Sequence, residues 1–64
     1  MKNVIATLEM ARELSKENNC PIYVYSNDEK MKVVAKLDWF DEVNERLLRE
    51  GYTVRCIFEK GKRV

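Results

Sequence analysis

Two runs of strand-forming residues flank a short polar segment in the middle of the chain, and this pattern limits the fold more than any other feature. Residues 22–25 are β-branched or aromatic, and residues 31–37 alternate between apolar and other side chains. Residues 26–30 include Ser, Asn and Asp, which favour turns through local hydrogen bonds to the backbone. The stretch from residue 20 to residue 37 therefore predicts a β-hairpin around which the rest of the chain is organised.

Apolar residues at helical spacing precede this hairpin. Val4, Leu8, Ala11 and Leu14 form one stripe within residues 3–18, and charged residues occupy the opposite side. Asn18 and Asn19 suit a helix end, because Asn tolerates the left-handed conformation that terminates helices, and Pro21 prevents continuation. The pattern predicts an amphipathic helix over residues 3–18.

A second helix and a third strand are expected after the hairpin. Asp38 is the predicted N-cap of a helix that runs to about Glu50, and Gly51 is its predicted C-terminal glycine. In the following strand, one row of alternating residues is expected to face the core and the other to face away. The inward row is Tyr52, Val54, Cys56 and Phe58, and the outward row is Thr53, Arg55, Ile57 and Glu59.

These elements predict an α+β fold in the order α-β-β-α-β. We expect a two-layer sandwich in which a three-stranded antiparallel sheet, with strand order 2-1-3, carries both helices on one face. Residues 1–59 would form a single compact domain, and residues 60–64 a flexible basic tail. The strand–helix–strand portion at residues 21–59 resembles half of a ferredoxin-like sheet, an architecture that enzymes, metal chaperones and RNA-binding proteins share. The resemblance therefore implies no particular activity.

Length and composition set further bounds. A chain of 64 residues buries only about 60% of its unfolded surface, so self-association would add stability. The net charge of +1 is typical neither of a strongly basic nucleic-acid-binding protein nor of an acidic DNA mimic. The sequence contains no apolar run of about 18 residues, and Glu9, Glu13 and Glu17 are unlike a secretory signal. We expect a cytoplasmic protein without a membrane partner. In its short length and its content of Lys, Glu and Asn, the chain resembles the short proteins of bacterial mobile elements.

The residues that usually carry catalysis are scarce. The chain has no histidine, and its two glycines form no phosphate-binding loop. Cys20 and Cys56 lie outside any CxxC pair, so we interpret both as reduced thiols. The neighbouring carboxylates at residues 28–29 and 41–42 are interpreted as part of a turn and of a helix start. The sequence predicts a non-enzymatic protein without catalytic residues, cofactor, metal or small-molecule substrate.

One predicted surface combines aromatic, aliphatic and basic side chains. If both helices cover the same side of the sheet, the other side is exposed, with Thr53 beside a set that we take as the candidate interaction face. That set is Tyr23, Tyr25, Lys32, Val34, Lys36, Arg55 and Ile57.

Three hypotheses follow for this face. Two copies of the chain could pack sheet to sheet, or strand to strand at an edge, to form a homodimer. The same face could bind another protein, as a small regulator or inhibitor would. As the alternative function, the two tyrosines could stack on the bases of single-stranded nucleic acid while basic side chains contact phosphates. These basic side chains are Lys32, Lys36 and Arg55 of the face and Lys60, Lys62 and Arg63 of the tail. We favour protein interaction, without separating a second copy from a different protein.

Overall fold

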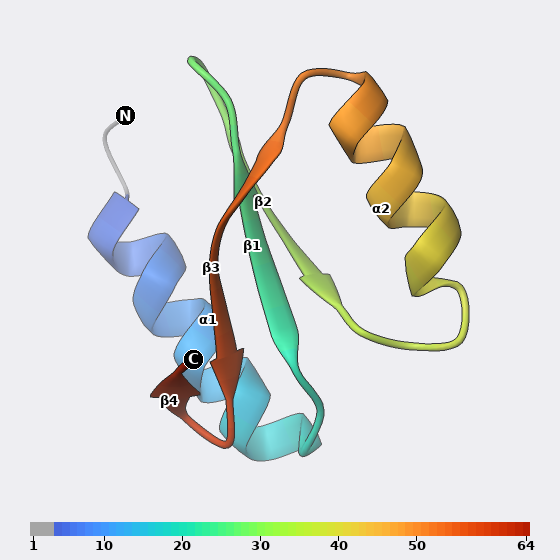
Figure 1. Cartoon of the computed structure of the whole chain (residues 1–64). Helices are drawn as coiled ribbons and strands as arrows, with labels where there is room; N and C mark the ends of the chain where they lie inside the picture. The colour runs from blue at the N-terminus through green and yellow to red at the C-terminus, as the bar shows by residue number, and fades with distance from the viewer. Residues whose placement is uncertain (1–3) are drawn as a thin grey trace.

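The computed structural model describes residues 4–64, and within them the chain forms two helices and one four-stranded antiparallel sheet (Figure 1). The elements are α1 (Val4–Asn18), β1 (Ile22–Ser26), β2 (Met31–Ala35), α2 (Phe40–Arg49), β3 (Thr53–Glu59) and β4 (Lys62–Arg63). The strand order is β2-β1-β3-β4. The predicted α+β class and the 2-1-3 order are confirmed, and β4 adds a fourth strand that was not predicted. Asn3, the predicted first residue of the first helix, lies outside the described residues.

A turn at Asn27 closes the hairpin of β1 and β2. The side-chain Oδ1 of Asn27 accepts hydrogen bonds from the backbone N–H groups of Glu29 (2.9 Å) and Lys30 (2.7 Å). The Asn27 N–H also donates to the carbonyl of Lys30 at 3.0 Å. One asparagine therefore orders the turn through its side chain and its backbone, as the turn-forming composition of this segment predicted.

The two helices lie on opposite faces of the sheet, so the prediction that both share one face, in two layers, is wrong (Figure 1). We call the core under α1 the α1-side cluster; its buried residues are Ala11, Ile22, Val24, Cys56 and Phe58. We call the core under α2 the α2-side cluster; its buried residues are Tyr25, Val34, Phe40, Leu47 and Tyr52. The physical reason is the residue run of β1, in which both alternating rows are bulky and each row requires its own cover.

A β-bulge in β3 divides that strand between the two faces. Val24 pairs with Cys56, but the next residue of β1, Tyr25, pairs with Val54, so Arg55 is the extra residue. The bulge reverses the alternation. Cys56 and Phe58 therefore face α1, whereas Tyr52 packs in the α2-side cluster. The predicted single inward row of β3 is wrong for this reason.

The ends of α2 differ from each other in how well the sequence predicted them. The helix ends in a Schellman motif, in which Gly51 (φ 96°) donates to the Leu48 carbonyl and Tyr52 donates to the Leu47 carbonyl. At the other end Trp39, not Asp38, is the N-cap residue, and no side chain caps the helix there. The predicted helix-ending glycine is confirmed, and the predicted N-cap is wrong.

Residues 60–64 form structure instead of the predicted flexible tail. Lys60 (φ 53°) and Gly61 (φ 79°) make a two-residue hairpin turn with both φ angles positive, and Lys62–Arg63 then pair with Phe58–Glu59. The buried hydroxyl of Ser15 in α1 accepts a hydrogen bond from the Gly61 N–H at 2.9 Å. It also donates to the Arg12 carbonyl at 2.7 Å. The helix thus holds the turn, and no local sequence pattern near residue 61 indicates so distant a partner.

Replacement of Tyr25 by Phe should change how stability depends on pH. Burial, with a smaller contribution from neighbouring Tyr23, raises the pKa of the Tyr25 phenol above its ordinary value of 10.0. The unfolded chain therefore loses this proton first, and the stability that the neutral phenol contributes is present below about pH 10 and lost as the pH rises through the folded-state pKa. Tyr25→Phe removes this loss. It also removes the 2.5 Å hydrogen bond to Asn44 Oδ1, at a cost of about 1 kcal/mol near neutral pH.

Urea unfolding at neutral pH and at about pH 10.5 measures both effects. Asn44→Ala is the matched control, because it removes the acceptor but keeps the phenol, so its loss of stability at alkaline pH should persist. An equal alkaline loss in Tyr25→Phe and in the unmodified protein would contradict the assignment.

Ser15→Ala should loosen the turn between β3 and β4. The substitution leaves the Gly61 N–H without its acceptor, so we expect a loss of about 1–2 kcal/mol of unfolding free energy and faster hydrogen exchange at the Gly61 amide. Ser26→Ala is the control, because Ser26 pairs with Thr53 at the far end of the sheet. Unchanged exchange at Gly61 in Ser15→Ala would show that the hydroxyl does not hold the turn.

Candidate functional site

The structure covers much of the predicted interaction face with α2. Tyr25 is fully buried and Val34 is also in the core, while Tyr23 and Ile57 are half-buried. The Tyr23 ring lies 4.5 Å from the Phe40 ring of α2 and 6.3 Å from the Tyr25 ring, centroid to centroid. The remaining members, Lys32, Lys36 and Arg55, are exposed. The basic residues of the predicted face are therefore exposed, but its apolar residues are buried or half-buried and do not form an open surface.

The predicted phosphate contacts lie away from the lysines of that face. Lys60, Lys62 and Arg63 are exposed on the turn and strand at the β4 edge. Lys32 belongs to β2, and β2 and β4 are the two outer strands of the order β2-β1-β3-β4. The structure thus places the basic residues of the β4 edge and Lys32 on opposite edges of the sheet. It also removes Tyr25 as a stacking platform for bases.

The outer edge of β2 presents backbone groups to solvent. Lys36 donates to the Pro21 carbonyl and Asn27 donates to the Lys30 carbonyl, and hydrogen-bonded pairs alternate along an antiparallel ladder. The backbone groups of Lys32 and Val34 therefore face β1. The N–H groups of Met31, Val33 and Ala35 point outward, where no strand of the described residues 4–64 pairs with them. The outward carbonyl of Ala35 accepts a 3.0 Å hydrogen bond from Leu37, and those of Met31 and Val33 lack a strand partner in the same range.

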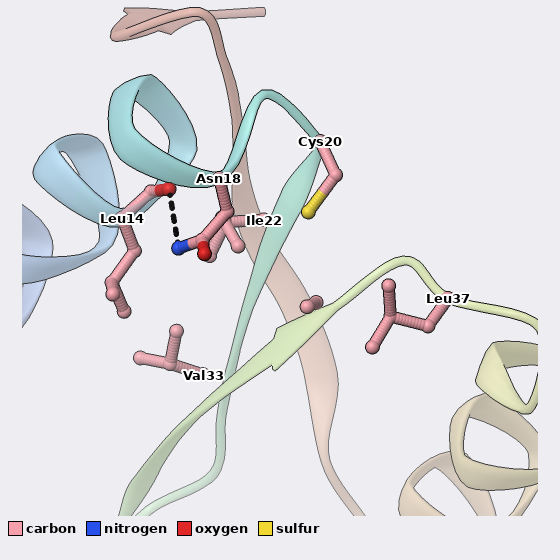
Figure 2. Close-up of a pocket in the computed structure, with 7 residues that line it drawn as sticks. Leu14, Asn18, Cys20, Ile22, Val33 and Leu37 are labelled. Atoms are coloured by element: carbon pink, nitrogen blue, oxygen red, sulfur yellow. Dashed lines mark hydrogen bonds between the residues drawn. The ribbon is translucent and has the colours of Figure 1, made fainter.

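An apolar groove of about 400 Å³ adjoins this edge on the α1 side of the sheet. We call it the edge groove; its lining residues are Leu14, Asn18, Cys20, Ile22, Val33, Ala35 and Leu37. Figure 2 shows Leu14 and Asn18 from α1 on one side, with Val33 and Leu37 across from them and Cys20 at one end. The amide of Asn18 donates to the Leu14 carbonyl at 3.0 Å, so its polar atoms are partly engaged by the helix.

The geometry of the edge groove follows from where two elements end. The helix α1 stops at Asn18, and Asn19 (φ 50°) turns the chain back towards β1. The apolar row of β2, whose side chains pack on the α1 side, therefore extends past the cover that the helix supplies. Leu37, two residues beyond the end of β2, remains about half exposed (49%). The result is an open apolar surface directly beside unpaired backbone groups.

The edge groove and the edge are suited to binding, and they bring no catalytic group together. Apart from the thiol of Cys20 and the amide of Asn18, the lining side chains are hydrocarbon. No cluster of three or more His, Cys, Asp or Glu side chains that could hold a metal occurs in the part of the chain that the structure describes. An extended peptide is the ligand that such a surface fits, because its backbone can pair with β2 while alternate side chains enter the groove.

The sequence pattern does not reveal this site, because most of the lining side chains are apolar residues of the kind that form a core. The row of Val33, Ala35 and Leu37 is wholly apolar, and such a row predicts cover by a helix and not an open groove. A usable signal was present in the predicted strand order. In the order 2-1-3 the strand at residues 31–37 is an outer strand. Its apolar row runs along the whole length of that strand.

Comparison with known proteins places this chain in no group: no family model, curated protein or solved structure matches it. Among residues 4–64, no helix combines the length and apolarity needed to cross a membrane. The candidate site therefore depends on geometry and chemistry alone.

The two cysteines should differ in reactivity. Cys20 is partly exposed in the edge groove, whereas Cys56 is buried in the α1-side cluster. Iodoacetamide should therefore modify Cys20 at least about tenfold faster than Cys56 in the folded protein, because the thiol must be reached to react. Mass spectrometry after timed quenching measures the two rates, and unfolding in urea should remove most of the difference. Equal rates in the folded state would contradict the described groove.

Proposed function

We propose that the protein is a non-enzymatic cytoplasmic interaction module that binds a segment of another protein along the outer edge of β2. The bound segment extends the sheet as a fifth strand. A small protein that binds in this way can act as a regulator or inhibitor of a larger partner, because it covers or displaces a strand that the partner needs.

The observation that carries the proposal is the combination of an unpaired edge with an apolar groove beside it. Met31, Val33 and Ala35 direct backbone groups outward, and the side chains of Val33 and Ala35 line the edge groove. A strand added at this edge gains backbone hydrogen bonds and places every second side chain over apolar surface. Backbone pairing supplies affinity, and the groove supplies a preference for apolar side chains.

The sheet has a second outer edge, and it is less suited to this role. Along β3, the β4 hairpin pairs with Phe58 and Glu59, and Val64 donates to the Ile57 carbonyl at 2.8 Å. The bulge at Arg55 interrupts the regular alternation of the same strand. Bulges and short outer strands both discourage pairing with another chain. The regular edge of β2 lacks these protections within the described residues.

A proline placed at the outer edge of β2 should abolish binding without unfolding the protein. The N–H of Val33 faces outward, so Val33→Pro removes a group that a bound strand needs while the ladder to β1 keeps its hydrogen bonds. The probe is a phage-displayed library of random peptides selected on the unmodified protein. We expect selected peptides to bind Val33→Pro at least about tenfold more weakly.

Arg63→Pro is the matched control at the other edge. The Glu59–Lys62 pair and the Val64–Ile57 hydrogen bond place the Arg63 N–H outward from β4. This variant should keep the affinity of the unmodified protein, and circular dichroism verifies that both variants fold. A library that yields no binder, or binders that tolerate Val33→Pro, would refute the proposed function.

A further inference from the structure

The lysines on β2 indicate what kind of strand the edge accepts. We propose that the partner is an extended segment in which apolar residues alternate with acidic residues, and that a second copy of this chain is excluded from the same edge. This inference rests on the proposed function and adds the chemistry of the partner. It follows from which face of the sheet each side chain of β2 occupies.

The two rows of β2 differ in character. Met31, Val33 and Ala35 pack on the α1 side, beside the edge groove. Lys32 and Val34, with Lys36 directly after the end of β2, make up the other row. Val34 lies in the α2-side cluster, and the Lys32 ammonium lies 5.5 Å from the centroid of the Tyr52 ring in the same cluster. The edge is therefore apolar on one face of the sheet and basic on the other.

Directly opposed residues in adjacent strands point to the same face, so the partner must alternate in the same way. Its residues opposite Val33 and Ala35 project over the edge groove, the residue opposite Met31 lies on the same apolar face, and all three should be apolar. Its residues opposite Lys32 and Lys36 project beside two exposed ammonium groups, where aspartate or glutamate forms a favourable cross-strand pair and lysine or arginine a repulsive one.

The same lysines oppose pairing between two copies of β2. The outward residues of two antiparallel strands can align in three registers around Val33, and each register sets lysine against lysine. With Val33 opposite Val33, Lys30 of one copy faces Lys36 of the other. With Met31 opposite Val33, Lys32 faces Lys32. With Val33 opposite Ala35, Lys32 faces Lys36.

Like charges directly opposed destabilise a strand pair, and lysine is a residue that proteins use to prevent association of outer strands. The edge thus rejects its own sequence and accepts a strand of opposite charge. The edge therefore discriminates between partners by charge. The net charge of the whole chain, +1, does not indicate this local preference.

Three synthetic peptides with blocked termini test the inference. The first alternates valine and glutamate, the second alternates valine and lysine, and the third has the composition of the first arranged in two blocks. Protection of Cys20 from iodoacetamide reports occupation of the edge groove, with buried Cys56 as the internal reference. We expect the first peptide to bind at least about tenfold more tightly than either of the others.

Charge reversal provides the matched variants. In the double variant Lys32→Glu and Lys36→Glu the order of the first two peptides should invert. The control, Lys62→Glu with Arg63→Glu, makes the same change of charge at the β4 edge and should leave the order unaltered. Equal affinity for the first two peptides would overturn the inference, because the lysines would then not select for charge. The same inversion in the control would also overturn it, because a general field effect would then suffice.

Two further measurements separate this inference from the proposed function. Peptides selected from the random library that depend on Val33 but lack acidic residues would overturn the inference while the proposed function stands; enrichment of alternating acidic and apolar residues would support both. Light scattering over a range of concentrations should give the mass of one chain, 7.6 kDa, for the unmodified protein. A dimer that Val33→Pro dissociates would identify a second copy as the occupant of the edge and overturn the inference.

Discussion

Strand β1 is buried on both of its faces, and the positions of the other elements depend on this constraint. Ile22 and Val24 require cover on one side, and Tyr23 and Tyr25 require it on the other. A single helix cannot supply both, so α1 and α2 take opposite faces, and β2 and β3 flank β1 within the sheet (Figure 1). The aromatic rings of the α2 side are large enough to fill the space beneath that helix, and the Tyr25 hydroxyl finds its partner in Asn44.

The elements that local rules govern could be predicted from the sequence. The Asn-containing turn of the hairpin, the end of α1 near Asn19 and the glycine that ends α2 each depend on a residue type suited to a particular backbone conformation. The elements that depend on distant partners could not be predicted in the same way. The bulge at Arg55 changes the face of every residue before it in β3, and no local pattern announces it. The turn at Gly61 is held by Ser15, which lies 46 residues earlier.

The candidate site shows the same division. Its outer strand follows from the predicted 2-1-3 order, and Lys32 and Lys36, on and directly after that strand, are among the interaction residues that the sequence predicts. The face that carries them is not the exposed apolar surface that was predicted, because α2 covers Tyr25 and Val34 on that side of the sheet. The run of Ile22, Tyr23, Val24 and Tyr25 contains the correction, since a strand exposed on one side usually alternates between apolar and polar residues. An apolar row in a central strand indicates cover more often than it indicates a binding surface.

The sheet separates the edge groove from the α2-side cluster, and the two have no residue in common. The side chains that pack in the α2-side cluster are not those that line the groove, so a substitution in one set does not change the composition of the other. The aromatic layer under α2 can be altered for stability without altering the walls of the groove. Conversely, the walls of the groove can vary in shape while the far side of the sheet maintains the fold. In a chain of 64 residues, this separation would let the lining of the edge groove change one residue at a time.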